Sequence, residues 1–477
     1  MKRIAIIGGG ISGLSAAFAL EKQQRNGVPL EYAVFESSPR LGGVLVTEHV
    51  EGCLIEAGPD SFLTEKPWAT DICREIGLGD QLIGSNDADR KTYILVNGRL
   101  VVIPDGLMFM VPTKILPTIF SPLFSLGAKL RMAAEWFHPP HKAVSDETVA
   151  AFVERHYGAE MVDRLADPLL SGVYGGEARH LSLRAVLPRF AEMEKNYGSL
   201  GRAMLAARRK MGQASKASAK PLFTSLRDGM QQMVDALVAR LTPAALHPGT
   251  RVTSLERREG GWSVSANGAA SSFDAVVIAT PTTTTADLIH NFSPGLASEL
   301  TGIQYTSSIT VNLGFDQKVR ASLPPGFGFL VPRSESKQML AATFVHNKFP
   351  HRAPEDRALL RCFIGGAASA QALKLSDDDV VRTVREELQQ ILGLTDIPLF
   401  TRVYRWNGAM AQYGVGHLER LEKIENLLTQ LPSLGLAGNG YRGIGVPDCV
   451  RSGSGAANRV LAAIGLGESQ PVTTVRM

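Results

Sequence analysis

Three glycines close to the start of the chain constrain its fold more than any other feature of the sequence. Gly8, Gly10 and Gly13 follow the apolar run Ile4–Ile7 with the spacing G-x-G-x-x-G. An apolar run of this kind is typical of a buried parallel strand, and the glycines after it predict a βαβ unit that binds a dinucleotide. Gly8 would permit the tight turn, Gly10 would let the backbone approach a pyrophosphate, and Gly13 would let the next helix lie close to the strand.

The segment after the turn completes the same unit. A helix would begin at the phosphates, and Ser12, which belongs to this turn, is included among the predicted cofactor residues. A second apolar strand, Glu31–Phe35, ends at Glu36. An acid at this point, about 20 residues beyond the glycines, is placed to accept hydrogen bonds from both ribose hydroxyls and would repel a 2′-phosphate. A glycine-rich turn in an unrelated α/β domain is the alternative, but strand, helix, strand and acid together favour the dinucleotide.

Length and composition restrict the classes of protein to which the chain can belong. Its 477 residues are too many for one ordinary core, so two or three lobes are expected. With 20% charged residues and a net charge of +4, nothing indicates a nucleic-acid partner. The four cysteines lie far apart without metal-ligand spacing, so we expect reduced thiols and no metal site. Met1 leads directly into the first strand and no apolar run reaches roughly 18 residues, which predicts a cytoplasmic protein without a spanning helix.

The hydrophobic patterns divide the chain into three expected parts, with an α/β fold class overall. A Rossmann-like nucleotide-binding domain would comprise residues 1–83, 221–290 and 426–477. An α+β substrate domain would comprise 84–105 and 291–425, beginning with a hairpin at Tyr93–Ile103 that turns at Asn97-Gly98. Residues 106–220 would form a helical lobe. Its apolar segment 107–137 is broken by prolines, and we interpret it as core, with contact to a membrane surface as the alternative.

Two further motifs distinguish the kind of dinucleotide. Arg40 is followed by the pair Gly42-Gly43, and Glu56-Ala-Gly58-Pro-Asp-Ser-Phe62 comes soon after. Both resemble the amine oxidase and phytoene desaturase superfamily of FAD enzymes. The resemblance implies FAD, with the glycine pair beside the flavin and Arg40 close to the cofactor, although a surface cation on a turn is the plain alternative for Arg40.

The same resemblance implies further cofactor residues along the chain. Gly58 belongs to the second motif, Val252 would lie beside adenine, and Gly438 and Val446 belong to a second glycine-rich junction between a strand and a helix. Such a junction brings helix N–H groups to the flavin ring or ribityl chain. A C-terminal helix that only packs against the domain is the alternative.

A narrower resemblance covers nearly the whole chain in order. The motifs Gly172-Val-Tyr-Gly-Gly176 and Gly326-Phe-Gly-Phe-Leu330-Val-Pro332, with Ala437-Gly-Asn439 to Cys449, resemble the oxygen-dependent porphyrinogen oxidases of haem synthesis. The resemblance implies a porphyrinogen substrate that loses six hydrogens in three flavin cycles, O2 reduced to hydrogen peroxide, and ferrochelatase as a downstream partner. Gly172 would line the cavity, Leu330 would pack on a pyrrole ring, and Phe349 would pack opposite. No catalytic residue is expected beyond the flavin.

One departure concerns the substrate carboxylates. Plant and animal relatives carry an Arg for a propionate where this chain has Thr92, so Lys91 or Arg90 would have to substitute. We place protoporphyrinogen IX narrowly ahead of coproporphyrinogen III, which stays open. More distant alternatives are a carotenoid desaturase, a flavin-binding protein without catalysis, and a flavin amine oxidase with an aromatic cage from Tyr413 and Tyr441. Peripheral contact with the inner face of the cell membrane is a further alternative, and the sequence predicts no oligomeric state.

Overall fold

A five-stranded parallel sheet carries the glycine turn. Its strand order is β12-β2-β1-β16-β22, so β1 lies at the centre with a parallel neighbour on each side. The strands are β1 (Lys2–Ile7), β2 (Leu30–Phe35), β12 (Leu246–His247), β16 (Ala275–Ile278) and β22 (Leu434–Leu436). The central strands are apolar throughout because both faces are covered: Ile4 and Ile6 pack into one core, and Ala5 and Ile7 into another.

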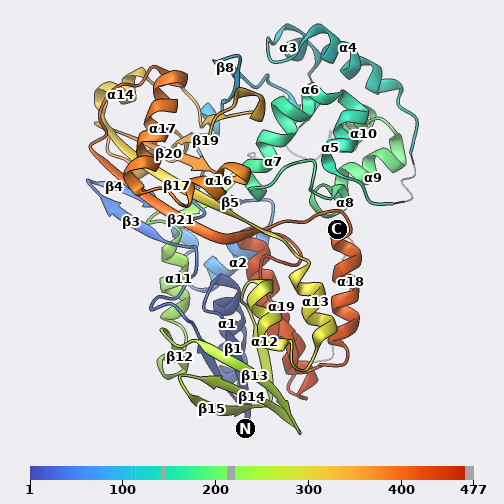
Figure 1. Ribbon diagram of the computed structural model, residues 1–477, viewed down its shortest axis with the longest axis vertical. Coiled ribbons are helices and arrows are strands. Elements are labelled where there is room, and N and C mark those ends of the chain that lie inside the picture. The colour runs from blue at the N-terminus through green and yellow to red at the C-terminus, as the bar shows by residue number, and fades with distance from the viewer. Residues whose placement is uncertain (109, 113, 142–144, 212–220, 468–477) are drawn as a thin grey trace.

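Helices cover one face of this sheet and a β-meander with further helices covers the other. On the first face lie α1 (Ile11–Arg25), α2 (Pro67–Glu75), α11 (Gln231–Val238) and α19 (Val446–Ala463). On the second lie β13 (Val252–Arg258), β14 (Gly261–Ala266), β15 (Ala269–Phe273), α12 (Thr282–Ile289), α13 (Pro294–Thr301) and α18 (His417–Leu428). In Figure 1 these elements fill the lower part of the molecule.

A seven-stranded sheet forms the upper left part of Figure 1. Its order is β21-β17-β20-β19-β18-β7-β8, with bounds β21 (Phe400–Ala411), β17 (Tyr305–Asp316), β20 (Arg357–Ile364), β19 (Met339–Phe344), β18 (Gly328–Leu330), β7 (Thr92–Val96) and β8 (Arg99–Val102). All pairings are antiparallel except that of β18 with β7. The predicted hairpin is confirmed: Asn97 and Gly98 both have positive φ, as its tight turn requires. The helices α14 (Gln317–Ser322), α16 (Gly366–Ala372) and α17 (Asp377–Leu392) flank the sheet.

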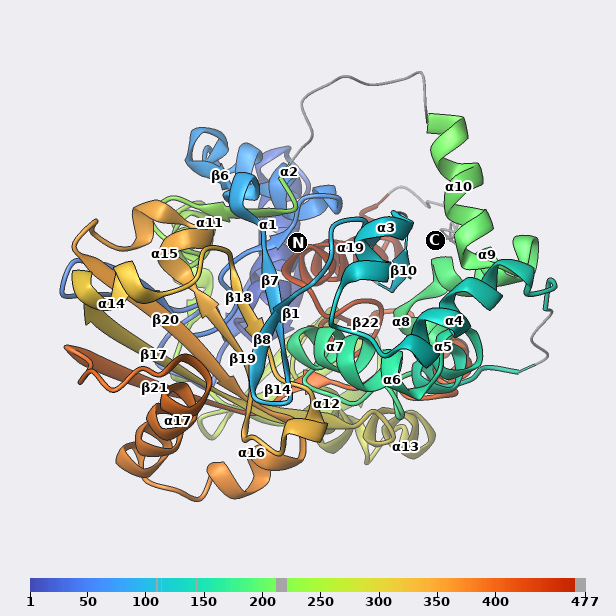
Figure 2. The ribbon, with the colours of Figure 1, turned by 90° about the horizontal axis from the view of Figure 1, so that it is seen from above.

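The third part is helical and has its own core, seen at the upper right of Figure 1 and on the right of Figure 2. Its helices are α3 (Ile115–Phe120), α4 (Leu126–Ala134), α5 (Val149–Tyr157), α6 (Ala159–Met161), α7 (Asp167–Tyr174), α8 (Leu183–Val186), α9 (Pro188–Tyr197) and α10 (Leu200–Met211). Figure 2 shows α7 on the side of the lobe that faces the sheet, and α7 contacts both β18 and β19. The lobe therefore meets the sheet through α7.

Short strands connect these three parts. They are β3 (Thr47–Val50) with β4 (Cys53–Glu56), β9 (Leu107–Met108) with β10 (Val111–Pro112), and β5 (Phe62–Leu63) and β6 (Leu82–Gly84) on either side of β11 (Phe223–Leu226). Short helices also occur at α15 (Val345–Lys348) and in 3-10 turns such as η3 (Glu135–Phe137) and η7 (Pro350–Arg352).

This computed structural model describes residues 1–108, 110–112, 114–141, 145–211 and 221–467. Part of the expected helical lobe, residues 212–220, lies outside the described residues. Within the described ranges, no helix combines the length and the apolar character needed to cross a membrane. The mixed sheets and helices confirm the predicted α/β fold class, while the domain limits stay a prediction.

Candidate functional site

The turn after β1 is tightly packed at two glycines and open at the third. Gly8 has φ of +108°, and a Cβ atom added at Gly13 would lie 1.8 Å from the carbonyl oxygen of Gly8. At Gly10, by contrast, no atom of the described residues lies within 4 Å of such a Cβ. Gly10 precedes the first residue of α1, and among the described side chains none caps this helix. Open space at a helix N-terminus fits a pyrophosphate, as the sequence predicts.

The acid at the end of β2 closes this turn. One Glu36 oxygen, Oε2, accepts a hydrogen bond from the Gly9 N–H at 2.7 Å, and the other accepts one from the Ser38 N–H at 2.7 Å. The Glu36 carbonyl accepts a hydrogen bond from the Thr250 N–H at 2.7 Å, which brings the start of β13 beside it. Val252 packs in the same core as Phe35, so the structure brings the predicted ribose and adenine residues together.

The Arg40–Gly43 turn lies against the phosphate turn. The Gly42 N–H donates to the carbonyl of Gly9 at 2.8 Å, and a Cβ atom at Gly43 would be 3.3 Å from the Gly10 Cα. The Arg40 guanidinium donates to the carbonyls of Leu41 and Leu45 at 2.8 and 3.0 Å. Burial lowers the pKa of Arg40. In this arrangement Arg40 fixes its own turn, and the glycine pair comes close to the phosphate site.

The remaining predicted cofactor residues lie around the same region. A Cβ atom at Gly58 would be 2.0 Å from the carbonyl oxygen of Val44, next to the glycine pair. The Gly438 N–H donates to the Ser452 hydroxyl at 3.1 Å, and Val446 begins α19. Ser12 lies where α1 and α19 cross, because a Cβ atom at Gly453 would be 2.0 Å from its carbonyl oxygen.

Two of the predicted substrate residues meet where α7 faces the sheet. A Cβ atom at Gly172, on α7, would lie 4.0 Å from Cδ2 of Leu330, the last residue of β18. Gly172 is exposed and Leu330 is half-buried. Lys91 is exposed just before β7, and its carbonyl accepts a hydrogen bond from Phe327 N–H at 2.7 Å. This places Lys91 at the start of the strand that pairs with β18.

Phe349 occupies a different environment from Leu330. Its side chain is fully buried, with the Lys348 ammonium 5.3 Å and the Arg352 guanidinium 4.7 Å from its ring centroid. Its predicted place opposite Leu330 stays a prediction. Neither cation was assigned a role from the sequence, although a Lys and an Arg on either side of a buried aromatic residue could have drawn attention to the segment.

The tyrosines proposed for an amine-binding cage have other contacts. The ring of Tyr413 stacks on His417 with centroids 4.1 Å apart, and its hydroxyl donates to the carbonyl of Asn439 at 2.7 Å. Tyr441 is buried in the same core. Next to Tyr413, the Gln412 side chain donates to the carbonyl of Tyr174 at 2.6 Å. Gln412 and Tyr413 together therefore connect the end of α7 to the segment before α19.

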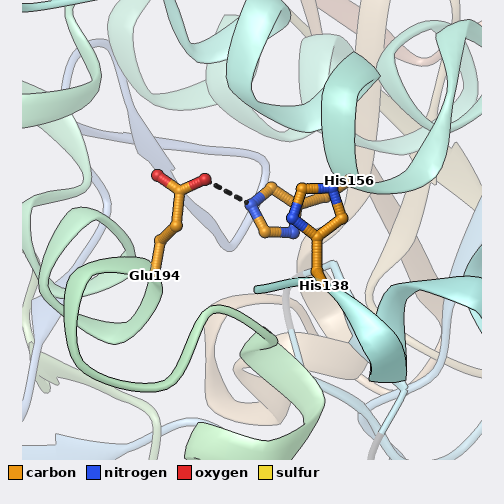
Figure 3. A group of neighbouring side chains, drawn as sticks. All are labelled: His138, His156 and Glu194. Atoms are coloured by element: carbon orange, nitrogen blue, oxygen red, sulfur yellow. Dashed lines mark hydrogen bonds and ion pairs between the residues drawn. The ribbon is translucent and has the colours of Figure 1, made fainter. Parts of the chain in front are cut away.

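The helical lobe holds a group with metal-ligand chemistry, shown in Figure 3. One ligand atom from each of His138, His156 and Glu194 lies within 4.8 Å of the others. The imidazole of His138 stacks on that of His156 with centroids 4.7 Å apart. His156 hydrogen-bonds Glu194 at 3.0 Å, and Arg155 pairs with Glu194 at 2.8 Å. Arg155 already compensates the charge of the Glu194 carboxylate, so an ion cluster explains why these side chains lie together without a metal ion. The absence of a metal site stays a prediction.

The parallel sheet, the glycine turn and the acid at the end of β2 define a dinucleotide-binding protein of the Rossmann type. The amino-acid sequence matches the family of flavin containing amine oxidoreductases over residues 11–461, and the chain belongs to this family. It is therefore a flavin-dependent oxidoreductase.

Comparison with individual relatives identifies a narrower group within this family. The chain is 35% identical to the coproporphyrinogen III oxidase of Bacillus subtilis (strain 168), covering 96% of this chain and 98% of that protein. It is 33% identical to the coproporphyrinogen III oxidase of Mycobacterium tuberculosis (strain ATCC 25618 / H37Rv), covering 96% and 97%. Protoporphyrinogen oxidase 2 of Arabidopsis thaliana is 27% identical, covering 97% and 94%. These relatives confirm membership of the porphyrinogen oxidase group.

Solved structures agree on the fold. A crystal structure provisionally named a protoporphyrinogen oxidase, from Exiguobacterium sp. 255-15, superposes with a TM-score of 0.86 at 29% identity, covering 97% of this chain and 99% of that one. Cyclohexylamine oxidase from Brevibacterium oxydans IH-35A superposes with a TM-score of 0.68 at 17% identity, covering 97% and 99%. At 17% identity, the similarity to cyclohexylamine oxidase shows a shared fold only.

Proposed function

We propose that this protein binds FAD and oxidises coproporphyrinogen III to coproporphyrin III, with O2 as the electron acceptor and hydrogen peroxide as the by-product. The observation that carries the proposal is the 35% identity to a coproporphyrinogen III oxidase over 98% of that protein. This choice reverses the narrow order of substrates that the sequence alone favours. Protoporphyrinogen IX is the second candidate, since a relative of 27% identity is named for that activity.

The residues of the nucleotide site fit FAD. The open space at Gly10 would receive the pyrophosphate, and Glu36 would accept the ribose hydroxyls in place of its two backbone N–H donors. FAD held there would supply the redox chemistry of the reaction, as an acceptor of hydride that O2 can reoxidise. The role of the protein is then to hold the cofactor and the macrocycle in the correct relative position and to exclude water.

The substrate would lie along the surface where Gly172 faces Leu330. A glycine on α7 leaves room for a flat ring, and Leu330 offers an apolar contact from β18. Lys91, exposed just before β7 of the same sheet, would pair with a propionate at the rim. Arg90 is the poorer candidate because its guanidinium lies 3.8 Å from the carboxylate of Asp87.

Turnover of the two porphyrinogens tests this proposal. Turnover is monitored by porphyrin fluorescence and by peroxide formation, and we expect kcat/KM to be higher for coproporphyrinogen III. We also expect acid precipitation to release the flavin as FAD. Lys91→Ala should lower kcat/KM for coproporphyrinogen III by a factor of roughly 1.4 to 5, because an exposed ion pair contributes about 0.2–1 kcal/mol.

Arg90→Ala is the matched control and should leave the ratio of the two kcat/KM values unchanged. A preference for protoporphyrinogen IX would return the assignment to the second candidate. Peroxide formation with a polyamine, and none with either porphyrinogen, would refute a porphyrinogen substrate altogether.

We further propose that the helical lobe rests on an anionic membrane surface, from which ferrochelatase would take the product. Large apolar side chains on α3, α4 and η3 face solvent: Leu116, Phe120, Leu126, Leu130 and Phe137 are 67%, 81%, 74%, 64% and 86% exposed. The bases Lys114 and Arg131 are exposed beside them. The interpretation of the whole 107–137 segment as core does not describe these side chains, since only part of the segment packs inward.

Binding to vesicles tests the membrane contact. We expect the protein to sediment with phosphatidylglycerol vesicles and to be released by salt or detergent. The double variant Phe120→Ser/Phe137→Ser should bind at least tenfold more weakly, because burying each Phe contributes about 1.5–3 kcal/mol. Ile397→Ser is the control, since Ile397 is 78% exposed but lies outside this segment. Equal binding of all three proteins would exclude this surface.

A further inference from the structure

Five charged side chains are buried together between the nucleotide-binding part and the seven-stranded sheet. Lys348 pairs with Asp60 at 2.9 Å, Arg352 pairs with Glu56 at 3.1 Å, and Arg361 lies 3.7 Å from Asp60. Each of these side chains is at most 14% exposed. Burial of so many charges costs free energy, because each charge must be removed from water.

The cluster is not neutral. Three cations face two carboxylates, which leaves a net charge of +1. Burial raises the pKa of Glu56 to about 7 in spite of Arg352, so this acid is protonated in part near neutral pH. Burial also acts to raise the pKa of Asp60, but Lys348 and the two guanidiniums outweigh it and hold that pKa well below its usual value. Burial lowers the pKa of Lys348 and of Arg361, although Asp60 acts against this effect on both. With all five groups ionised, the formal charge of the cluster is +1.

Some N–H groups of these paired cations have no hydrogen-bond partner among the described residues. The Nε and one terminal nitrogen of Arg352, together with Nε of Arg361, are buried without a hydrogen-bond acceptor among the described residues. Arg352 is only 1% exposed. Unpaired guanidinium N–H groups at such depth indicate that the cluster lacks hydrogen-bond acceptors for part of its donors.

The same cations fix a stretch of backbone. Arg361 donates to the carbonyl of Gly58, and Arg352 donates to that of Asp60 at 3.1 Å. Trp406, on β21, donates to the carbonyl of Ala57 at 2.9 Å. Side chains from the seven-stranded sheet and the η7 turn thus hold the segment 56–60 by its carbonyl groups.

This segment belongs to the candidate cofactor site. Gly58 packs against Val44, which follows the glycine pair beside the phosphate turn. At its other end the segment continues into β5, which contacts α19, and Lys66 pairs with Asp448 in the first turn of α19 at 2.6 Å. The clamped backbone therefore runs from the phosphate turn to the helix end that the sequence assigns to the flavin ring.

We propose that the buried cluster of Glu56, Asp60, Lys348, Arg352 and Arg361 supplies a net positive charge that stabilises the reduced flavin, while Arg352 and Arg361 act as positioning residues for the segment 56–60. A flavin that takes up two electrons and one proton becomes an anion, so a fixed positive charge nearby favours the reduced form and raises the reduction potential. The inference rests on the proposed function only in requiring bound FAD.

The test uses variants that change the charge in opposite directions. Lys348→Met makes the cluster neutral and Asp60→Asn raises its charge to +2, whereas the double variant restores +1. The two-electron potential of the bound FAD is measured by spectroelectrochemical titration of each purified holoenzyme, without porphyrinogen. We expect Lys348→Met to lower the potential by at least about 30 mV, which is a tenfold change in the relative affinity for oxidised and reduced flavin, and Asp60→Asn to raise it.

The sign of the two shifts separates an electrostatic role from a structural one. A cluster that only supports the fold would give shifts in the same direction or none, and either result with FAD still bound would overturn the proposal. The double variant should return close to the wild-type potential. If Lys348→Met does not fold, Lys348→Gln removes the same charge and keeps an amide donor for Asp60. Failure of the wild-type protein to bind FAD would instead refute the proposed function.

Discussion

Gly13→Ala is expected to leave the protein without flavin and to lower its free energy of unfolding by about 3 kcal/mol, the upper part of the range for inserting one methyl group into a packed site. The added Cβ would lie 1.8 Å from the carbonyl oxygen of Gly8. That oxygen belongs to the backbone of a turn already held at a positive φ, so it cannot move aside as a flexible side chain would. Either α1 must shift from β1 or the turn must open, and both movements displace the phosphate site.

Gly10→Ala is the matched control because the same methyl group meets open space. Among the described residues nothing lies within 4 Å of its Cβ, and its φ of −72° suits alanine. We therefore expect the thermal unfolding midpoint of this apo-variant to equal that of the wild-type apoprotein. FAD affinity should nevertheless fall at least tenfold, since the methyl group would occupy the space expected to receive the pyrophosphate.

Fluorescence titration with FAD and thermal unfolding of the apoproteins distinguish these two effects. Gly13→Ala should be impaired in both measurements, and Gly10→Ala in binding alone. Wild-type FAD affinity in Gly10→Ala would show that the open space at Gly10 is not part of the cofactor site.

Local patterns in the sequence were enough for much of the fold. Apolar residues repeat with helical spacing over Asp377–Leu392 and predict an amphipathic helix there. α17 is found with these bounds, and Gly393 ends it in the left-handed conformation. Within residues 64–83, the spacing of Trp68, Ile72 and Ile76 before Gly77 predicts a helix and its C-terminal stop, and α2 is found there, ending at Glu75 just before Gly77 with its positive φ. The strand β21 and helix α18 were not predicted. β21 carries two arginines and Gly408 on a half-buried surface, so it lacks the apolar pattern of a core strand.

The candidate site likewise contains some residues that local sequence patterns predict and others that only the folded chain brings together. The glycine turn and Glu36 form one contiguous motif, and their spacing alone predicts their geometry. The buried cations could not be found in this way, because Arg361 meets Gly58 only after two distant parts of the chain pack together. An Arg within the apolar strand Arg357–Ile364 was the available signal, since a charge in such a strand needs a buried partner. Likewise Gly172 and Leu330 are neighbours through the contact of α7 with β18.

The ion cluster of the helical lobe should be one of the strongest single contributions to stability. His156 lies between two carboxylates, with Nδ1 3.3 Å from Glu135 and Nε2 3.0 Å from Glu194, and none of the three side chains is more than 2% exposed. Figure 3 shows its ring directed at Glu194 with His138 stacked alongside. Burial acts to lower the pKa of His156, but its hydrogen bonds to the two carboxylates outweigh burial and raise it above 6.5. The imidazolium is therefore the form that this site stabilises.

The pH dependence follows from the direction of each shift. Because the folded pKa of His156 is raised, its contribution is complete below 6.5 and is lost as pH rises through that raised value. Burial acts to raise the pKa of Glu135 and Glu194, but their hydrogen bonds to His156 outweigh it and lower both. Their contribution is complete above 4.5 and is lost as pH falls through the lowered values. Arg155 pairs with Glu194 throughout this range, while burial lowers the pKa of His138.

His156→Leu is accordingly expected to lower the free energy of unfolding by about 3–5 kcal/mol at pH 6, because it removes the cation from two buried carboxylates. His156→Gln keeps amide donors of similar reach and should lose less. In both variants the decrease of the thermal midpoint that the wild type shows as pH rises above 6.5 should disappear, since the titrating group is gone. Thermal unfolding of all three proteins from pH 5 to 9 checks this. An unchanged dependence on pH in His156→Gln would assign the titration to another group, and a loss below about 1 kcal/mol in His156→Leu would show that Arg155 alone compensates the carboxylates.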